Sequence, residues 1–174
     1  MKLLYAIHKY DVFLFMFLLN TRNHQILVQI SRYISKTADG PIYVLIAGLL
    51  YWRENLENPL LQAMLWAFLI ERPIYFVLKN GFKRNRPQIA LQNFRSFITP
   101  SDKFSFPSGH TSAAFMMATL IGYFFPLLFI PLYSWAVLVG CSRVMLGVHF
   151  PTDTLVGALL GVSTAIFSLQ QVVL

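Results

Sequence analysis

Charged side chains are scarce in this sequence, and their scarcity excludes an ordinary soluble domain. Only 12% of the 174 residues are charged and 56% are hydrophobic, whereas soluble proteins carry roughly a quarter charged residues. Cysteine is almost absent, because Cys141 is the only one, and a lone cysteine excludes an internal disulfide. We therefore expect a single membrane-embedded domain over residues 1–174.

Acidic residues are the second shortage, since 7 Asp and Glu stand against 14 Lys and Arg. The basic residues crowd beside apolar segments, which favours anionic lipid or phosphate as the partner and not nucleic acid. Aromatic residues make up 16% of the chain, as suits a small bundle that meets both lipid tails and headgroups. The predicted partners are the bilayer and a phosphate-bearing lipid.

Long apolar segments predict an all-α bundle, because a helix needs about 20 apolar residues to cross a bilayer. Residues 41–52 can extend upstream and residues 58–78 are long enough, so both are predicted spans. Residues 108–148 have about twice the length of one crossing, and the prolines of FFPLLFIP break them into an out-and-back hairpin. The last segment begins at Pro151, where a first-turn proline belongs, and completes a prediction of about five transmembrane helices.

The first 36 residues are interpreted as two amphipathic helices that lie at the membrane interface or cross it incompletely. The two apolar runs, YDVFLFMFLL and QILVQISRYI, are each too short to cross, and NTRNH separates them. No small-residue cleavage site follows the first run, so we expect this segment to be retained and not removed as a signal peptide.

Three polar clusters are predicted to meet at one membrane face. Residues 80–107 contain nothing able to cross, so KNGFKRNRP and the turn PSGH lie on the same side, and the apolar hairpin returns SRVMLGVHFPTD to that side. Arginine offers forked hydrogen bonds, lysine offers a point charge, and helix starts offer backbone donors. The clusters therefore indicate a phosphate pocket with fixed cations at Lys79, Arg86 and Arg143.

The PSGH turn adds three candidates at the start of an apolar helix. Ser108 is placed to give a hydroxyl, and Gly109 lets the backbone approach an oxyanion closely. His110 lies in the first helical turn and is aimed at the same anion. A histidine on its own is more often structural, but the other two clusters favour a functional role here.

These residues resemble the type-2 phosphatidic acid phosphatase superfamily, which also includes bacterial acid phosphatases and vanadium-dependent haloperoxidases. The three motifs of that family read here as Lys79 with Arg86-Pro87, Pro107-Ser108-Gly109-His110, and Ser142-Arg143 with His149 and Asp153. Each motif is a weak match alone, but three in order with the correct spacings are specific. The short N-terminus most resembles that of small bacterial undecaprenyl-diphosphate phosphatases.

The resemblance implies a mechanism and a role for each motif residue. His149 would attack phosphorus to form a phosphohistidine, Asp153 would orient its ring, and His110 would protonate the leaving oxygen. No metal or other cofactor is expected, because cations and amides take that role and no carboxylate cluster on this face suits magnesium. Charge on the phosphoryl oxygens would be neutralised by Lys79, Arg86, Ser108, Gly109 and Arg143.

The predicted function is hydrolysis of a phosphate or diphosphate on a lipid whose tail stays in the bilayer. Undecaprenyl diphosphate is the first candidate substrate, followed by phosphatidic acid and phosphatidylglycerophosphate, because the motifs recognise phosphate and not the tail. Lipid phosphotransfer through the same phosphohistidine is a related alternative, and a non-catalytic membrane scaffold or transporter is the alternative from another class. A vanadium haloperoxidase shares the motifs, but the multiple spans and small size argue against it.

Other polar and aromatic residues carry weaker signals. Glu71 and Arg72 lie inside a span, where ionisable groups are costly, so they form either a structural polar pair or a support for the site. Lys83 and Arg84 are interpreted as ordinary interface cations. The segment FRSFITPSDKFSF is interpreted as interfacial packing or as a lid, with four candidate phenylalanines at positions 94, 97, 104 and 106.

Two signals conflict on the membrane side that the site faces. The motif face carries far more Lys and Arg than the loop WRENLEN at the opposite end, which by the positive-inside rule indicates the cytoplasm. Phosphate binding explains those cations, however, and the resembling bacterial enzymes work on the outer face. The prediction is therefore a bacterial inner-membrane protein with its site facing the periplasm or outer face.

Overall fold

The computed structural model describes residues 2–100 and 102–173, and within them the chain is helical. The only extended pairing in this part of the chain is a single bridge between Asn85 and Phe104, so the all-α prediction is confirmed. The helices are α1 (Lys2–Leu19), α2 (His24–Lys36), α3 (Gly40–Glu54), η1 (Asn55–Glu57), α4 (Pro59–Phe82), α5 (Pro87–Ala90), α6 (Gly109–Phe124), η2 (Pro126–Leu128), α7 (Phe129–Met145) and α8 (Pro151–Val172).

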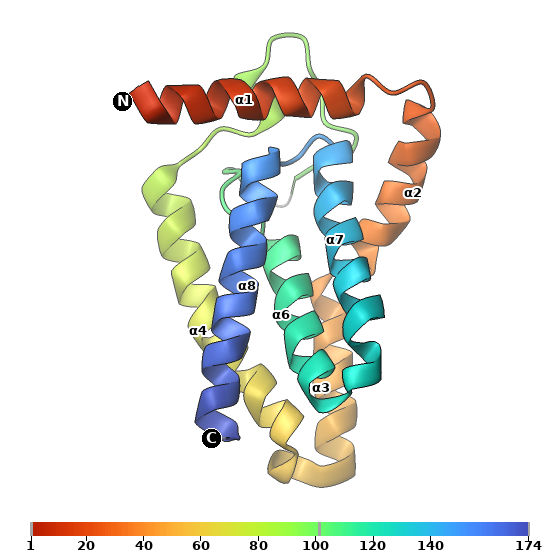
Figure 1. Ribbon diagram of the computed structural model, residues 1–174, viewed down its shortest axis with the longest axis vertical. Coiled ribbons are helices and arrows are strands. Elements are labelled where there is room, and N and C mark those ends of the chain that lie inside the picture. The colour runs from red at the N-terminus through yellow and green to blue at the C-terminus, as the bar shows by residue number, and fades with distance from the viewer. Residues whose placement is uncertain (1, 101, 174) are drawn as a thin grey trace.

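The helices form a bundle with one helix laid across its end. Helices α3, α4, α6, α7 and α8 run along the long axis of the molecule, and α1 lies across the end at which α8 begins (Figure 1). Helix α2 descends from the same end and packs against α7. The two predicted N-terminal helices are thus present, and α1 covers the end of the bundle that carries the motifs.

Local sequence signals account for where the helices begin and end. Helix α4 begins after Asn58, whose side chain accepts a hydrogen bond from the backbone N–H of Leu61 at 2.9 Å, as an N-cap residue does. The predicted hairpin breaks at Pro126, which begins η2 between α6 and α7. Pro151 begins α8 as expected, because a first-turn proline loses no helical hydrogen bond.

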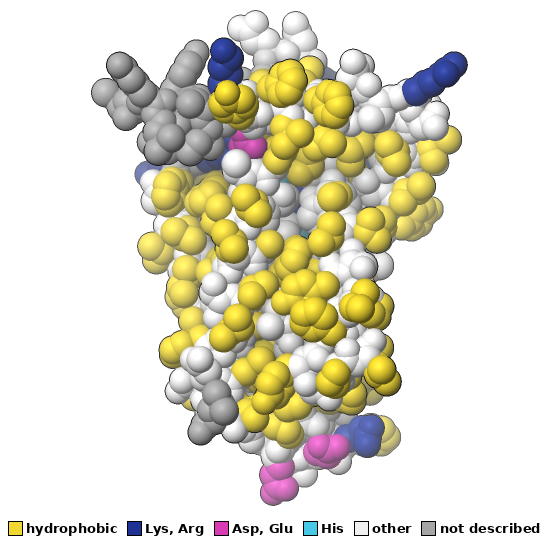
Figure 2. Space-filling model, in the orientation of Figure 1, with side chains coloured by type: hydrophobic (Ala, Val, Ile, Leu, Met, Phe, Trp, Pro, Cys, Tyr) yellow, Lys and Arg dark blue, Asp and Glu magenta, His cyan; other side chains and the backbone are white. Residues whose placement is uncertain are grey.

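The surface and the helix lengths fit a protein that crosses a membrane. Among the described residues, 59–82, 126–145 and 151–172 are helical stretches long and apolar enough to cross. Figure 2 shows apolar side chains along the height of one face, with charged side chains gathered at its two ends. Helices α3 and α6 have 15 and 16 residues, less than the roughly 20 that a crossing needs, so the number of five crossings stays a prediction.

Small residues let α6 and α8 approach closely beside the motifs. A Cβ atom added at Gly157 would lie 2.6 Å from the backbone oxygen of Ser108, and one at Gly161 would collide with the backbone oxygen of Ser112. Glycines four residues apart are a common device for close packing of membrane helices. The close approach places the start of α6 against the first turn of α8, where the Ser108 N–H donates to the Asp153 backbone oxygen at 2.9 Å.

The main apolar core lies between α4, α6 and α8. It is nearer than the motifs to the opposite end of the bundle. Side chains of α4 such as Met64 pack there with Met116, Met117 and Leu120 of α6, all of them 1% exposed or less. Leu169 from the last turns of α8 joins the same cluster. This core keeps the three helices in fixed positions beneath the polar residues.

Candidate active site

The three motifs meet where α4 and α7 end and where α6 and α8 begin. Lys79 lies in the last turn of α4, and Arg143 lies in the last turn of α7. Gly109 opens α6 and Asp153 lies in the first turn of α8. His149 is in the short connection that precedes α8. Segments far apart in the sequence are thereby brought to one end of the bundle.

A cavity of about 290 Å³ lies at this meeting point. Ser108 and Asp153 are completely buried beside it. Lys79 is connected to the cavity through Tyr75, whose hydroxyl accepts a hydrogen bond from the lysine ammonium. Five of the predicted site residues line the cavity, namely Arg86, Gly109, His110, Arg143 and His149.

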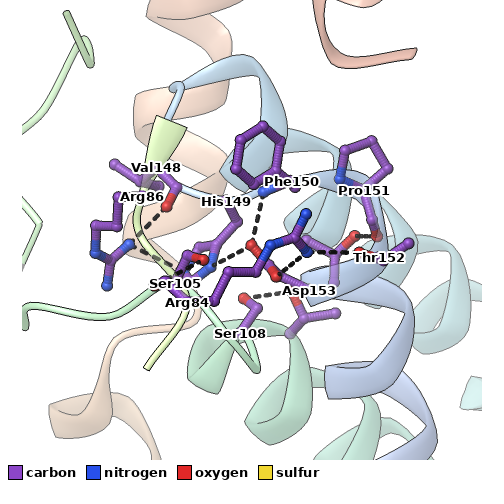
Figure 3. Close-up of polar contacts among 12 residues, drawn as sticks. Arg84, Arg86, Ser105, Ser108, Val148, His149, Phe150, Pro151, Thr152 and Asp153 are labelled. Atoms are coloured by element: carbon purple, nitrogen blue, oxygen red, sulfur yellow. Dashed lines mark hydrogen bonds and ion pairs between the residues drawn. The ribbon is translucent and has the colours of Figure 1, made fainter. Parts of the chain in front are cut away.

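The ring of His149 lies between a carboxylate and a guanidinium (Figure 3). Its Nδ1 is 3.7 Å from Asp153 Oδ2, which is too long for a hydrogen bond, and its Nε2 is 3.5 Å from Arg86 Nη1. Asp153 is itself held, because its Oδ2 accepts from the Phe150 N–H at 2.8 Å and its Oδ1 accepts from Arg84 Nη1 at 2.8 Å. Nε2 is therefore the ring nitrogen that faces the cations.

The surroundings of His149 keep its imidazole neutral. Burial lowers the pKa of His149 below its ordinary value of 6.5, and the nearby Arg143 and Arg86 cations lower it further against the opposing influence of Asp153. The ring therefore carries no positive charge at neutral pH and gains one only well below pH 6.5. A neutral imidazole has the free lone pair that a nucleophile requires.

A carboxylate that the sequence analysis did not single out lies between two motif cations. Asp102 Oδ2 accepts hydrogen bonds from Lys79 Nζ at 2.8 Å and from the Tyr75 hydroxyl at 2.9 Å. Its Oδ1 pairs with Arg86, which also donates from Nε to the Asp102 backbone oxygen at 3.0 Å. An anion from the protein therefore already occupies the point at which Lys79 and Arg86 converge.

The charge on Asp102 persists at every physiological pH. Partial burial alone raises the pKa of Asp102, but Lys79 and Arg86 outweigh burial and lower the pKa to about 2. A phosphate group that binds to the same cations must therefore displace this carboxylate or share the cations with it.

The donor set of the site suits an anion. Lys79, Arg86 and Arg143 are each less than a tenth exposed, and partly desolvated cations bind phosphate more strongly than exposed ones do. The buried Nε of Arg143 has no hydrogen-bond partner in the described part of the chain. Among those same residues, no group of three or more His, Cys, Asp or Glu side chains is placed to hold a metal ion.

His110 lies at the boundary between this cavity and a second one. Its Nε2 is 2.9 Å from Oδ1 of Asp39, which precedes α3. The second cavity has a volume of about 530 Å³, and Arg32, Lys36 and Arg143 line it beside His110. Asp39 went unnoticed in the sequence because it is 71 residues from its partner. It holds the imidazole in place between the two cavities.

The interpretation of Arg84 as an ordinary interface cation is wrong. Its side chain is only 20% exposed and donates to Asp153 and to Asp11 of α1. Asp11 also accepts from the Thr152 N–H at 3.0 Å, so Arg84 and Asp11 together hold α1 against the start of α8. One sequence signal pointed to Arg84. Arg86 precedes Pro87, and a residue before proline favours an extended backbone. Alternate residues of an extended chain face the same side, so Arg84 is expected on the same face as Arg86.

The polar pair of α4 and the aromatic segment have definite partners. Glu71 is completely buried, accepts from the Ser112 hydroxyl at 2.6 Å and pairs with Arg72. In the aromatic segment, Phe97 lines the larger cavity, whereas Phe94 packs edge-on against a phenylalanine of α1. The lid over the phosphate pocket stays a prediction.

Comparison with known proteins gives a family match and two similar relatives. A family model described as the PAP2 superfamily matches residues 59–174, which include all three motifs. Phosphatidylglycerophosphatase B of Bacillus subtilis (strain 168) is 37% identical over 133 residues, which cover 70% of this chain and 61% of that protein. The bacitracin transport permease protein BcrC of Bacillus licheniformis is 32% identical over 136 residues, which cover 75% of this chain and 66% of that protein. The chain thus spans less than two thirds of the length of either relative.

A solved structure resembles the fold over nearly the whole chain. It is a crystal structure described as the first transmembrane PAP2-type phosphatidylglycerolphosphate phosphatase, from Bacillus subtilis. The TM-score is 0.80 at 29% sequence identity, and the match covers 95% of this chain and 86% of that one. The similarity therefore extends upstream of the family match, into the N-terminal helices.

Proposed function

The chain belongs to the PAP2 superfamily, and from this premise we propose that it hydrolyses the phosphate or diphosphate of a lipid. One observation carries the proposal: the buried cations Arg86 and Arg143 line one cavity together with the neutral ring of His149 and with His110. Buried cations hold and polarise a phosphoryl group, a neutral imidazole attacks it, and a second histidine protonates the leaving oxygen.

His149 is the nucleophile of the first chemical step. Its Nε2 forms a bond to phosphorus while the bond from phosphorus to the leaving oxygen breaks, and the negative charge of Asp153, 3.7 Å from Nδ1, favours the tautomer that carries the proton on Nδ1. His110 gives a proton to the departing oxygen. Water then attacks the phosphohistidine and gives a proton back to His110, while the bond from phosphorus to Nε2 breaks, which releases inorganic phosphate and restores the free His149.

Negative charge on the transferring phosphoryl group is met by the motif cations and by the start of α6. Lys79, Arg86 and Arg143 supply positive charge, and Ser108 and Gly109 supply a hydroxyl and an amide. Ser108 Oγ lies 2.9 Å from Thr111 Oγ1, which fixes its position before substrate arrives. Loss of one such donor costs roughly a hundred- to a thousandfold in rate.

The first candidate substrate is undecaprenyl diphosphate, and phosphatidylglycerophosphate and phosphatidic acid follow. The name of the B. subtilis relative, phosphatidylglycerophosphatase B, supports the second of these. The proposed location is the bacterial inner membrane, with the site at its outer face. A lipid tail that remains in the bilayer reaches such a site without leaving the membrane.

Release of inorganic phosphate from a panel of these lipids by the detergent-purified chain, in excess chelator, tests the proposal. His149→Ala should abolish turnover and also the trapping of labelled phosphate on the protein, while the variant stays folded. His24→Ala is the matched control, because His24 lines neither of the two cavities that contain His110, and it should keep its activity. Substantial activity in His149→Ala, or dependence on a metal that the chelator removes, would contradict the proposal.

A further inference from the structure

We propose that Arg72 forms a second anion subsite, which binds the tail-bearing phosphate of a lipid diphosphate and makes diphosphates better substrates than monophosphates. This inference rests on the proposed phosphatase function of the cavity around His149. None of the three motifs contains Arg72, which lies inside α4, seven residues before the motif cation Lys79.

Arg72 lies deep within α4, where a charged side chain in a membrane span has a high free-energy cost. Helix α4 has 24 residues, which at 1.5 Å per residue gives a length of about 36 Å. Arg72 follows Pro59 by 13 residues and precedes Lys79 by 7, so it lies about 20 Å along the helix and about 10 Å deeper than Lys79. A charged side chain at such a depth is rare and usually marks a functional site.

The guanidinium of Arg72 has N–H groups that the described residues leave without an acceptor. Its Nε pairs with Glu71, but its two terminal nitrogens donate no hydrogen bond to any residue that the structure describes. The group stacks over the ring of Tyr75 at 4.8 Å, and 47% of the side chain is exposed. Two parallel free N–H groups of an arginine match two oxygens of a phosphate.

Arg72 lines the same cavity of about 290 Å³ as His110 and His149. Ala38 and Phe68 also line this cavity and give it apolar surface that a lipid tail can contact. Because Arg72 and His149 line one cavity, a diphosphate whose terminal phosphate lies beside His149 can extend its next phosphate toward Arg72. A monophosphate has no second anionic group to reach this arginine.

A structural role of Arg72 as the counterion of Glu71 is the rival explanation. Glu71 is completely buried, and removal of only one member of such a pair leaves a buried charge without compensation. Arg72→Gln alone is therefore at risk of unfolding. The double variant Glu71→Gln with Arg72→Gln removes both charges together, and Glu71→Gln alone removes the partner but keeps the arginine.

The experiment compares kcat/KM of the full-length, detergent-purified chain for farnesyl diphosphate and for farnesyl monophosphate. The ratio of the two values should fall roughly 10- to 100-fold in the double variant, as expected for loss of a charge-assisted contact to one phosphate. The ratio should stay near that of the parent chain in Glu71→Gln. Calorimetric titration should also show weaker binding of inorganic diphosphate, relative to inorganic phosphate, in the double variant.

The outcomes separate this inference from the function on which it rests. An unchanged ratio in the double variant, or an equal fall in Glu71→Gln, would show that Arg72 serves only the pair with Glu71 and would overturn the subsite. If the parent chain hydrolyses neither farnesyl compound nor any lipid of the panel, the proposed function fails, and the titration alone then decides whether Arg72 binds a second phosphate. A loss of selective diphosphate binding in the titration supports the subsite independently of turnover.

Discussion

Replacement of Asp102 by asparagine should make the site bind phosphate-like anions more tightly. The carboxylate lies between Lys79 and Arg86, where an incoming anion must compete with it for the same cations. Asparagine keeps the size of the side chain and removes its charge. The variant therefore removes the competitor while the cations remain.

The structure sets the size of the effect. The pKa of Asp102 is lowered from 3.8 to about 2, which corresponds to about 2.5 kcal/mol of attraction at about 1.4 kcal/mol per tenfold change in acidity. The side chain is 37% exposed, so solvent screening reduces the usable part to about 1–2 kcal/mol. The affinity for vanadate, a mimic of the transferring phosphoryl group, should accordingly rise roughly 5- to 30-fold.

The assay is inhibition of phosphate release by vanadate in detergent-purified protein at pH 5.5 and at pH 7.5. The gain should be the same at both, because a carboxylate with its pKa lowered to about 2 is ionised in the parent chain at either pH and would lose its charge only as the pH approached 2. Glu57→Gln makes the same chemical change at the exposed end of η1 and should leave inhibition unaltered. Unchanged or weaker vanadate inhibition in Asp102→Asn would show that the carboxylate positions the cations and does not compete with the substrate.

Three further variants test the site and the packing around it. Arg84→Gln should lower the free energy of unfolding by about 3 kcal/mol, because it leaves buried carboxylates uncompensated; thermal denaturation in detergent measures this, with the exposed neighbour Lys83→Gln as control. His110→Ala should slow hydrolysis of an alkyl phosphate much more than that of nitrophenyl phosphate, since only the basic alkoxide needs a proton, and an equal loss for both would contradict the acid role. Gly161→Ala should destabilise the chain by about 1–3 kcal/mol through its collision with α6. Gly48→Ala, with nothing within 4 Å of the added atom, should be neutral or slightly stabilising, and equal effects of the two glycine variants would refute the packing argument.

The parts of the fold that sequence alone predicted are those set by local chemistry. Pro126 breaks the hairpin and Pro151 begins α8 because each acts on its own turn of the chain. The motif residues were predictable as candidates because they flank helix ends, so the hairpin alone brings them to one side. Helix lengths were less predictable, since the depth at which a helix ends depends on what packs around it.

The supporting residues of the site were beyond sequence reasoning for a physical reason. Asp39 contacts a residue 71 positions away, and Asp11 contacts one 141 positions away. No spacing rule connects such pairs, because only the packing of the helices brings them together. Asp102 lies in a loop without periodic pattern, and nothing in its neighbours indicated that it would turn inward to the cations.

The position of α1 across the end of the bundle has a consequence for how the protein is made. Helix α1 leaves the ribosome before α4 and α8, yet its Asp11 contacts Arg84 and Thr152, which follow by 73 and 141 residues. At common rates of translation Thr152 emerges roughly 7–30 s after Asp11. Asp153, which needs Arg84, belongs to the same late segment. A growing chain therefore carries no complete site around His149 until α8 has entered the membrane and packed against α1.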